Sequence, residues 1–412
     1  MQGQHTIQEA MDQREGILVP LDLPEFRIHR QEWQTDGTIK VEVIAITTQA
    51  RCPHCQRVSR KIHDRRARRK RDLPLRHHQV ELIVLKRRFW CVQCCKPFTE
   101  LDTACGRRRR TTKRLREEIG KQASIQPIAH VSNQYEVGPR FVQTCLRRVA
   151  QEEIEQKGLS LDEEQALPTP RFLGIDEFAR RKGHRYDTIL CDLQEHRVLE
   201  ISEGRTLQEV KRLLTRLKEP EQVEAVSMDM SASFRPAVEA CLPQAQIVVD
   251  HFHVMQHVMK GFRKIVSSWA HKKEGMILLH GKQHLFLRAQ EDLTEEQAQE
   301  RHRIGQHLPA LEMAWQLKEE LRDWYATARI ETAEHYLDRW IQHVRESSFD
   351  HLKKTLSAFV NWRNEILAFF EFRISNGFVE GKNNRTKSIM RQGYGISNRQ
   401  NLRLRILLAD RE

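Results

Sequence analysis

The stretch that decides the fold reads FLGIDEF, over residues 172–178. Its apolar first half has the length of a buried strand, and Asp176 follows at the predicted C-terminal end of that strand. Asp229 ends a second apolar run, residues 223–228, and a third acid, Glu380, occurs much later. Carboxylates gathered at one edge of a sheet repel one another unless a cation lies between them, and Mg²⁺ prefers carboxylates, waters and phosphate oxygens. These acids therefore predict a divalent-metal site suited to phosphodiesters.

The segments around Asp176 and Asp229 predict an α/β domain. Three meandering strands, a helix and then parallel strands alternating with helices follow the order of a ribonuclease H-like core. Downstream, residues 253–372 have a uniformly helical pattern, so Glu380 would follow a large all-helical insertion. We expect its five tryptophans in the helix-packing core, not on base-stacking surfaces. The predicted elements are strands at 172–178, 186–193 and 197–202, a helix at about 206–218, a strand at 223–229, a helix at 233–241 and a strand at 246–250.

Each acid also admits a reading that involves no metal. Asp176 would then cap a strand end, Asp229 would cap the helix near Ser231, and Glu380 would be an acid on a helix surface. The rival candidates for the third acid are Glu177, Glu365 and Glu371.

Asp250 competes with Asp229 for the second position, because it too ends an apolar run. It belongs to the following strand, so we favour Asp229 as the metal ligand. His253, three residues after Asp250, suits a role beside the ligands or a contact to DNA.

Positive charge is concentrated in one part of the chain. The 412 residues contain 69 Lys and Arg against 56 Asp and Glu, a net charge of +13. Residues 51–116 contain 22 and 5 of these, or +17, so the remainder carries −4. The run RRARRKR at residues 65–71 is dense for a surface without an anionic partner, although a solvated basic face is the simpler alternative. The charge favours nucleic acid as the partner.

Two Cys-x-x-Cys pairs, Cys52/Cys55 and Cys91/Cys94, predict a zinc ribbon, because each tight turn offers two thiolates to a tetrahedral Zn²⁺. A strand-like segment, residues 80–90, leads directly into the second pair. Cys95 and His54 remain alternative ligands. The four other cysteines are expected to be buried apolar residues or free thiols, since a reducing cytosol does not sustain disulfides. They are Cys105, Cys145, Cys191 and Cys241.

A helix-turn-helix is predicted after the zinc ribbon. A helical stretch from about 111 to 124 is followed by a second short segment and a break near 137–139. Residues 140–149 then show an apolar helical stripe with a polar opposite face, as in a recognition helix. Residues 151–170, acidic and ending in Pro-Thr-Pro, read as a linker. The predicted DNA-contacting residues are Arg107, Arg108, Arg109, Arg110, Arg140, Gln143 and Arg147.

The expected organisation is α/β multidomain. The N-terminus lacks a signal-peptide core and no apolar run approaches the ~20 residues of a membrane span, so we expect a soluble, intracellular protein. The predicted parts are 1–106 with the zinc ribbon, 107–150 as the helix-turn-helix, 151–170 as the linker, 171–252 as the first part of the catalytic core, 253–372 as the helical insertion and 373–412 as the end of the core.

Taken together, these segments resemble DDE transposases of bacterial insertion sequences, and within them the ISL-three family, over nearly the whole chain. The resemblance rests on CPHC at 52–55, RDLP at 71–74, RRFWC at 87–91, LGIDEF at 173–178, DMS at 229–231, DHFHV at 250–254 and NGFVEGKNN at 376–384. It implies that Asp176, Asp229 and Glu380 form the metal-binding triad, and that Asp250 with His253 corresponds to an Asp-x-x-His element near the second acid.

The function implied by this resemblance is a transposase that binds the terminal inverted repeats of an insertion sequence and performs metal-dependent strand cleavage and strand transfer. The implied cofactors are structural Zn²⁺ and catalytic Mg²⁺ or Mn²⁺, and the partners are double-stranded DNA at the element ends and target, with a homodimer or higher oligomer on DNA. Lys382 and Arg385 would hold the phosphate backbone. We expect a cytoplasmic, nucleoid-associated bacterial protein. The alternatives are a DNA-binding regulator with an inactive ribonuclease H-like domain, or a structure-specific nuclease of the same fold.

Overall fold

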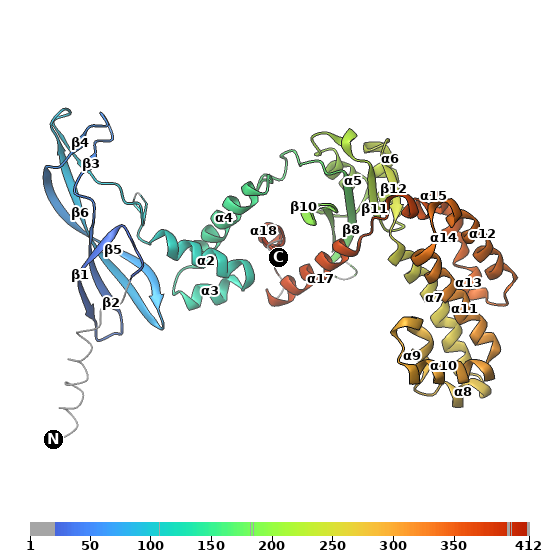
Figure 1. Ribbon diagram of the computed structural model, residues 1–412. Helices are drawn as coiled ribbons and strands as arrows, with labels where there is room; N and C mark the ends of the chain where they lie inside the picture. Colours follow the sequence, from blue (N-terminus) through green and yellow to red (C-terminus); the bar gives the residue numbers. More distant parts are fainter. Residues whose placement is uncertain are drawn as a thin grey trace, which may run out of the picture. The chain divides into compact units, whose positions relative to one another are not determined.

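The computed structural model describes residues 21–106, 108–181, 183, 185–393, 396 and 398–409. The chain divides into two compact units, Met1–Glu153 and Ile154–Glu412 (Figure 1). Arg107, one of the residues predicted to contact DNA, lies outside the described residues. The first twenty residues of the chain lie outside them as well.

The first unit is built on a five-stranded sheet. Its strands are β1 (Phe26–Trp33), β2 (Ile39–Ala45), β5 (Ile62–Leu75), β6 (His78–Cys91) and β7 (Lys96–Thr99), in the order β1-β2-β6-β5 with β7 also paired to β6. The short strands β3 (Ala50–Arg51) and β4 (Val58–Ser59) pair with each other.

Alternation of apolar residues explains the core of this sheet. Val41 on β2 lies opposite Leu82 on β6 in a parallel register, and both are fully buried. Every second residue of each strand therefore faces one apolar layer, as a pleated strand requires. The buried core residues are Ile39, Val41, Val43, Val80, Leu82 and Val84.

Three helices follow the sheet: α2 (Lys113–Ile125), α3 (Ile128–Gln134) and α4 (Pro139–Gln156), of which α4 has its last three residues beyond the end of the first unit. α2 begins where the Thr112 hydroxyl accepts a hydrogen bond from the Leu115 N–H, at 3.3 Å. α4 buries most of the predicted apolar stripe, with Phe141 half-buried, and continues to Gln156, six residues into the segment that reads as a linker. The stripe residues that are buried are Val142, Cys145, Leu146 and Val149.

One end of β5 joins the sheet to these helices. The buried Asp72 carboxylate accepts hydrogen bonds from the Thr112 hydroxyl at 2.6 Å and the Arg114 Nε at 2.9 Å. The Arg71 guanidinium donates to the backbone carbonyls of Tyr135 and Glu136. Because charge-assisted bonds at buried positions are costly to break, this junction fixes the sheet against the helices.

The second unit contains a mixed sheet with the order β10-β9-β8-β11-β12. β8 (Phe172–Arg181), β9 (Arg185–Asp192) and β10 (Arg197–Glu203) form an antiparallel meander, whereas β11 (Ala225–Met228) and β12 (Gln246–Val249) run parallel to β8 and to each other. The helix α6 (Phe234–Cys241) connects β11 to β12, and α5 (Leu207–Leu214) precedes β11. The predicted order of strands and helices is confirmed.

Two details of the prediction are wrong. The helix predicted at 206–218 ends at Leu214, followed by irregular chain and a short 3₁₀ turn at Pro220–Gln222. Asp176 is also not at the end of its strand, because β8 continues to Arg181. The apolar run stops at residue 175, but the antiparallel pairing of β8 with β9 carries the strand onward into its more polar half.

An all-helical region follows β12, as predicted. Its apolar residues form one core that also includes Ala225, Val248 and Val249 of β11 and β12, so the helices pack directly onto the sheet. The helices are α7 (His251–Ala270), α8 (Lys273–Leu278), α9 (Gln283–Leu287), a 3₁₀ turn (Gln290–Asp292), α10 (Glu295–His307), α11 (Pro309–Thr327), α12 (Ile330–Glu346), α13 (Asp350–Lys353), α14 (Leu356–Asn361), α15 (Arg363–Leu367) and α16 (Phe369–Phe372).

The tryptophans belong to this helical core, as the sequence predicts. The Trp324 indole N–H donates to the Ala333 carbonyl at 2.9 Å, and the Trp340 indole N–H donates to the Leu317 carbonyl at 2.8 Å. Both rings are buried, so their polar atoms are satisfied inside the core. Trp315 is buried in the same cluster, and the partly buried Trp269 and Trp362 pack against it.

Two helices complete the second unit: α17 (Gly377–Gln392) and α18 (Arg399–Leu408). α17 packs on β8 and α18 packs on β10. α18 is held by the buried Glu200 carboxylate, which accepts from the Arg403 Nε at 2.6 Å and from Arg216 at 2.8 Å. The chain thus returns to the sheet after the helical region.

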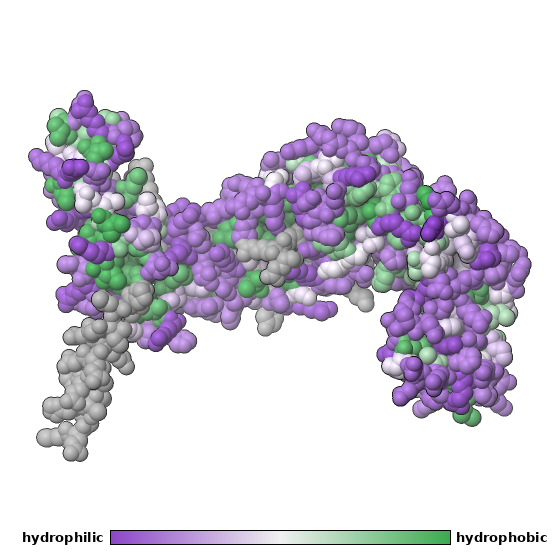
Figure 2. Space-filling model, in the orientation of Figure 1, coloured by the Kyte–Doolittle hydropathy of each residue, from purple (hydrophilic) through white to green (hydrophobic). Residues whose placement is uncertain are grey.

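The visible surface is mainly hydrophilic, with apolar residues in small groups (Figure 2). None of the helices in the described part of the chain has the length and apolar character needed to cross a bilayer.

Candidate metal centres and nucleic-acid interface

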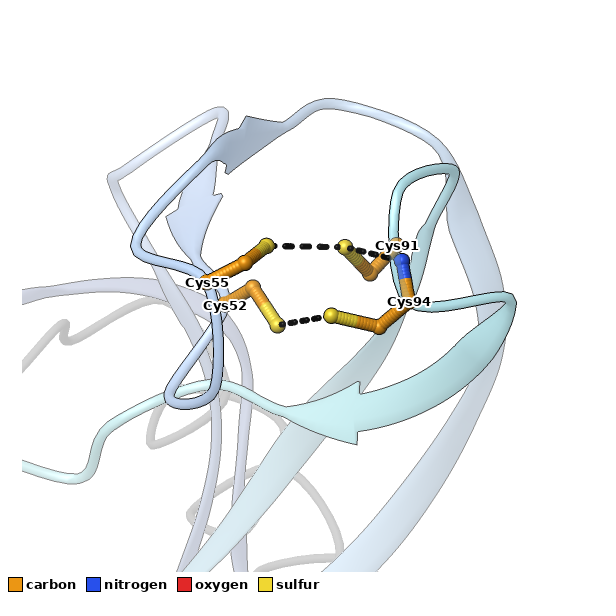
Figure 3. Close-up of side chains that lie close together, drawn as sticks. All are labelled: Cys52, Cys55, Cys91 and Cys94. Atoms are coloured by element: carbon orange, nitrogen blue, oxygen red, sulfur yellow. Dashed lines mark hydrogen bonds between the residues drawn. The ribbon is translucent and has the colours of Figure 1, made fainter.

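Four cysteine sulfurs converge in the first unit (Figure 3). The Sγ atoms of Cys52 and Cys94 are 3.8 Å apart, those of Cys55 and Cys91 are 3.4 Å apart, and all four lie within 4.8 Å of one another. A tetrahedral Zn²⁺ with Zn–S bonds of ~2.3 Å places its sulfurs about 3.8 Å apart. The cluster therefore fits a structural zinc ion.

Local backbone geometry resolves the choice between Cys94 and Cys95. Cys95 has φ +49°, is exposed, and directs its Sγ to the Val92 carbonyl at 3.4 Å, outside the cluster. His54 is not among the clustered side chains either. Nearby backbone N–H groups, that of Cys55 first, lower the pKa of the Cys52 thiol to about 6, whereas the hydrogen bond with Cys55 and burial raise the pKa of Cys94 to about 12; a bound zinc ion would favour the thiolate at both.

The second candidate centre starts from Asp176, which is buried on β8. Its Oδ1 accepts from the Glu177 backbone N–H and its Oδ2 accepts from the Asn383 side-chain amide, each at 2.7 Å. The pKa of Asp176 is raised to about 6, mainly by burial and also by the nearby Asp229 carboxylate, while the hydrogen bonds to Asp176 and the charge of His253 act in the opposite direction. Because burial disfavours the ionised form of Asp176, a cation bound next to it would stabilise that form.

Asp229 lies beside Asp176 because β8 and β11 are parallel neighbours. Ser227 is paired with Gly174, so Asp229, two residues beyond this last pair and directly after β11, lies near Asp176, where its charge acts on the pKa of Asp176. The Asp229 Oδ1 is buried and has no hydrogen-bond partner among the described residues. Burial raises the pKa of Asp229, with His253 and Arg205 opposing the effect. The capping alternative is not supported, since α6 begins after Ser233.

Glu380 is positioned by the contacts that hold α17 against β8. The Asn376 amide donates to the Ile175 carbonyl at 3.0 Å, and the Asn383 amide donates to Asp176. Residues 376, 380 and 383 share one face of a helix by their i, i+4 and i+7 spacing. Glu380 is therefore on the helix face that meets β8 next to Asp176. Its carboxylate makes no hydrogen bond or ion pair to the described residues. The converged group of potential metal ligands among the described residues is the cysteine cluster, not the three acids.

Gly174 permits this close approach. A Cβ at Gly174 would come within 2.7 Å of Val379 on α17 and of Leu193, and within 3.1 Å of Asn376. Such contacts are shorter than side-chain packing allows, so only glycine lets α17 reach the strand. Neither Asn383 nor this role of Gly174 is predicted by the residue pattern alone.

Asp250 and His253 lie beside these acids. Asp250 is buried at the start of α7, and its backbone N–H donates to the Met228 carbonyl at 3.0 Å. Its side chain makes no capping hydrogen bond, and its carboxylate lies 4.0 Å from the His253 Nε2. His253 influences the pKa of both Asp176 and Asp229, so it is part of the same cluster.

The rival acids make ion pairs or are exposed, although Glu177 follows Asp176 directly and its charge raises the pKa of Asp229. Glu365 is paired with Arg235 at 2.6 Å, and Glu177 is paired with Arg205 at 2.6 Å. Glu371 is exposed on the short helix α16. None of the three is placed on the face of α17 that meets β8.

A family model described as "Transposase", of the DDE type, matches residues 173–406, more than half of the chain. The chain belongs to the ISL3 family of DDE transposases. A second model, described as the zinc-finger of transposase IS204/IS1001/IS1096/IS1165, matches residues 48–94. The resemblance found in the sequence is thereby confirmed, and a DDE transposase is a nucleic-acid cleavage and transfer enzyme.

Individual relatives agree with this assignment. The transposase for insertion sequence element IS1001 from Bordetella parapertussis is 27% identical over 396 residues, which cover 93% of this chain and 95% of the relative. The transposase for insertion sequence element IS1557 from Mycobacterium tuberculosis is 23% identical over 259 residues, covering 56% of this chain and 58% of the relative.

In this ISL3-family transposase, the basic run at 65–71 is divided between two environments. Lys70 is buried and pairs with Asp102 at 3.7 Å, and Arg71 is used in the junction with the helices. The preceding arginines are exposed on β5, an edge strand of its sheet. They are Arg65, Arg66, Arg68 and Arg69.

The other predicted DNA-contacting residues of the transposase lie on three segments. Arg108, Arg109 and Arg110 are exposed in the loop before α2. On α4, Arg140 and Arg147 are exposed and Gln143 is half-buried. On α17, Arg385 is exposed, whereas Lys382 is half-buried with its ammonium 5.0 Å from the centre of the Phe378 ring. Their contacts to DNA remain predictions.

Proposed function

We propose that this transposase binds the terminal inverted repeats of its insertion sequence, cuts the DNA at the element ends and joins the freed 3′ ends to target DNA. The observation that carries the proposal is the junction of β8, β11 and α17. There, Asp176 and Asp229 lie side by side, and Asn383 attaches the Glu380-bearing helix to Asp176. Segments separated by more than 200 residues thus bring three acids towards one place.

We assign the second unit to the ribonuclease H-like class. The supporting feature is the strand order β10-β9-β8-β11-β12, with three antiparallel strands followed by two parallel ones. The first acid on β8, the second directly after β11 and the third on a helix beyond the helical region suit this class. The helical region 253–372 is then an insertion between the second and third acids.

The acid site fits a hard divalent cation such as Mg²⁺ or Mn²⁺. Asp176, Asp229 and Glu380 would hold it, since a buried carboxylate oxygen without a partner and a carboxyl with a raised pKa both gain from a positive charge. When bound, the metal supplies Lewis-acid activation of a water and stabilisation of the leaving 3′ oxygen. Asn383 and the Glu177 N–H orient the Asp176 carboxylate, which leaves its remaining lone pairs for the site.

DNA recognition is assigned to the first unit. α2, α3 and α4 supply the three helices of a helix-turn-helix, with α4 as recognition helix, because it buries one face and exposes Arg140, Thr144 and Arg147 on the other. The arginines of β5 would neutralise phosphates beside it. An element has two ends, so we also propose that at least two copies assemble on DNA.

Cleavage and joining of a labelled element-end duplex by the purified full chain with Mg²⁺ test the proposal. Asp176→Asn, Asp229→Asn and Glu380→Gln should each abolish both reactions and leave end binding nearly intact. Glu371→Gln, an exposed acid nearby in sequence, is the matched control and should react like the wild type. Asp250→Asn should be milder or impair folding.

The products separate the competing functions. A wild-type protein that binds ends but cuts nothing would be a regulator, and one that cuts without joining would be a nuclease. Substantial strand transfer by Glu380→Gln would show that the third acid is assigned incorrectly.

A further inference from the structure

A short, firmly held loop lies next to the acid site. It connects β10 to α5 through Glu203, Gly204, Arg205 and Thr206. Gly204 has φ +84°, its N–H donates to the Tyr186 carbonyl at 2.9 Å, and its carbonyl accepts from the Thr188 hydroxyl at 2.7 Å. Thr206 and Glu209 then form a capping box that begins α5. The backbone on both sides of Arg205 is therefore fixed.

The Arg205 side chain is also held in place by its neighbours. Its guanidinium carbon lies 3.8 Å from the centre of the Tyr186 ring, and its Nη1 donates to the Glu177 carboxylate at 2.6 Å. Its other guanidinium N–H groups have no partner among the described residues, and 46% of the side chain is exposed. A stacked, partly paired guanidinium with free donors loses little conformational entropy when it binds an anion.

Arg205 is also electrostatically linked to the acids. Its partner Glu177 directly follows Asp176, and the charge on Arg205 opposes the burial that raises the pKa of Asp229. Arg205 is thus exposed beside Glu177 and within electrostatic range of Asp229, where, on the function proposed above, a DNA phosphate must enter.

We propose that Arg205 binds a non-bridging oxygen of a substrate DNA phosphate beside the acid site. The inference rests on the proposed function. The guanidinium N–H groups not used by Glu177 can donate to that oxygen, and Glu177 with Tyr186 holds the guanidinium for the contact before DNA arrives. The positive charge also offsets the repulsion between the DNA phosphate and the acid cluster.

Chemical neutralisation of single phosphates tests this contact directly. The full chain is titrated with element-end duplexes that carry one methylphosphonate at successive positions around the cleavage point, in Ca²⁺ buffer so that binding is measured without turnover. Arg205→Ala should weaken binding of the unmodified duplex by about 10- to 100-fold. Arg205→Lys, which keeps the charge but not the fork, should lie between Arg205→Ala and the wild type.

The decisive result is non-additivity at one position. There, the methylphosphonate should weaken wild-type binding strongly but have little further effect on Arg205→Ala, because the same contact is already lost. Arg212→Ala is the matched control, since Arg212 is exposed on α5 and pairs with Glu164 away from the acids. It should bind like the wild type at every position.

The proposal would be overturned if, at every phosphate tested, the methylphosphonate weakened binding of Arg205→Ala by the same factor as binding of the wild type. Equal losses of affinity in Arg205→Ala and Arg212→Ala would also overturn it. Because Arg205→Lys retains the cation on Tyr186, it keeps the test valid if the alanine variant folds poorly. The binding measurement is independent of catalysis. Failure of the wild type to cut DNA in Mg²⁺ would count against the proposed function, whereas the phosphate scan would still decide the role of Arg205.

Discussion

Replacing Asp176 by Asn should stabilise the metal-free protein while it abolishes cleavage. Burial raises the pKa of Asp176 from its ordinary value of 3.8 to about 6, so the native state disfavours the ionised carboxylate at neutral pH. Each tenfold change in proton affinity corresponds to about 1.4 kcal/mol, so ionisation in the folded protein costs about 3 kcal/mol. The amide removes this cost because it carries no charge.

The hydrogen bonds of Asp176 reduce the expected gain only in part. An amide oxygen at position 176 can still accept from the Glu177 N–H. Asn383 can rotate its own amide so that its oxygen, which has no partner in the wild type, accepts from the new NH₂ group. Losing one charge-assisted bond costs about 1–2 kcal/mol. We therefore expect a net stabilisation of about 1–2 kcal/mol at pH 7.5 without metal.

The stability difference between Asp176→Asn and the wild type should depend on pH. Between pH 4 and 6 the folded wild type binds more protons at Asp176 than the unfolded chain does, so wild-type stability falls as pH rises through this range. The stability of Asp176→Asn relative to the wild type should therefore rise by about 3 kcal/mol between pH 4 and 6, from about 1–2 kcal/mol less stable below pH 4 to about 1–2 kcal/mol more stable above pH 6. Mg²⁺ should reduce the stability advantage of Asp176→Asn over the wild type, because only the wild type is stabilised by binding the ion.

Thermal unfolding in EDTA at several pH values, followed by tryptophan fluorescence, measures the effect. Five of the seven tryptophans are in the second unit, and a gain of 1 kcal/mol there raises Tm by about 2–4 °C. Asp323→Asn, at an exposed acid on α11, is the control and should not change Tm. A less stable Asp176→Asn protein at pH 7.5, or a difference that does not vary between pH 4 and 6, would refute the reasoning.

Three further predictions follow from other contacts. Replacing Cys52 and Cys55 by Ser should release zinc and unfold only the first unit, while Cys95→Ser should retain the metal; elemental analysis and proteolysis check this. Gly174→Ala should lower the free energy of unfolding by about 1–3 kcal/mol and impair cleavage, because it would move α17. Its control is Gly381→Ala on α17, where the added methyl group meets no atoms within 4 Å; in urea unfolding this variant should be as stable as the wild type or slightly more stable. Replacing Arg68 and Arg69 by Ala should weaken DNA binding almost independently of sequence and reduce the salt slope by about 2, and an unchanged slope would exclude β5 as a phosphate-binding strand.

The sequence predicts the elements around the acids well because each depends on local patterns. The meander, the parallel strands and the helical region follow from apolar periodicity and length, and the Cys-x-x-Cys spacing predicts the sulfur cluster. Its errors occur where neighbours override that pattern. β8 extends past Asp176 because β9 supplies hydrogen bonds to its polar half, and the basic run of β5 is divided because Asp102 and the helices bind its last two residues.

By itself the sequence determined the family, the zinc ligands as two pairs, the order of the secondary structure and the acids that deserve mutation. Only the tertiary structure decided which residues meet: Asp229 near Asp176, Asn383 bonded to Asp176, Gly174 admitting α17, and Cys94 rather than Cys95 in the sulfur cluster. The physical reason is that periodicity, propensity and motif spacing act over a few residues. The contact between Asp176 and Asn383 joins residues 207 apart in the chain and depends on the packing of α17 against β8.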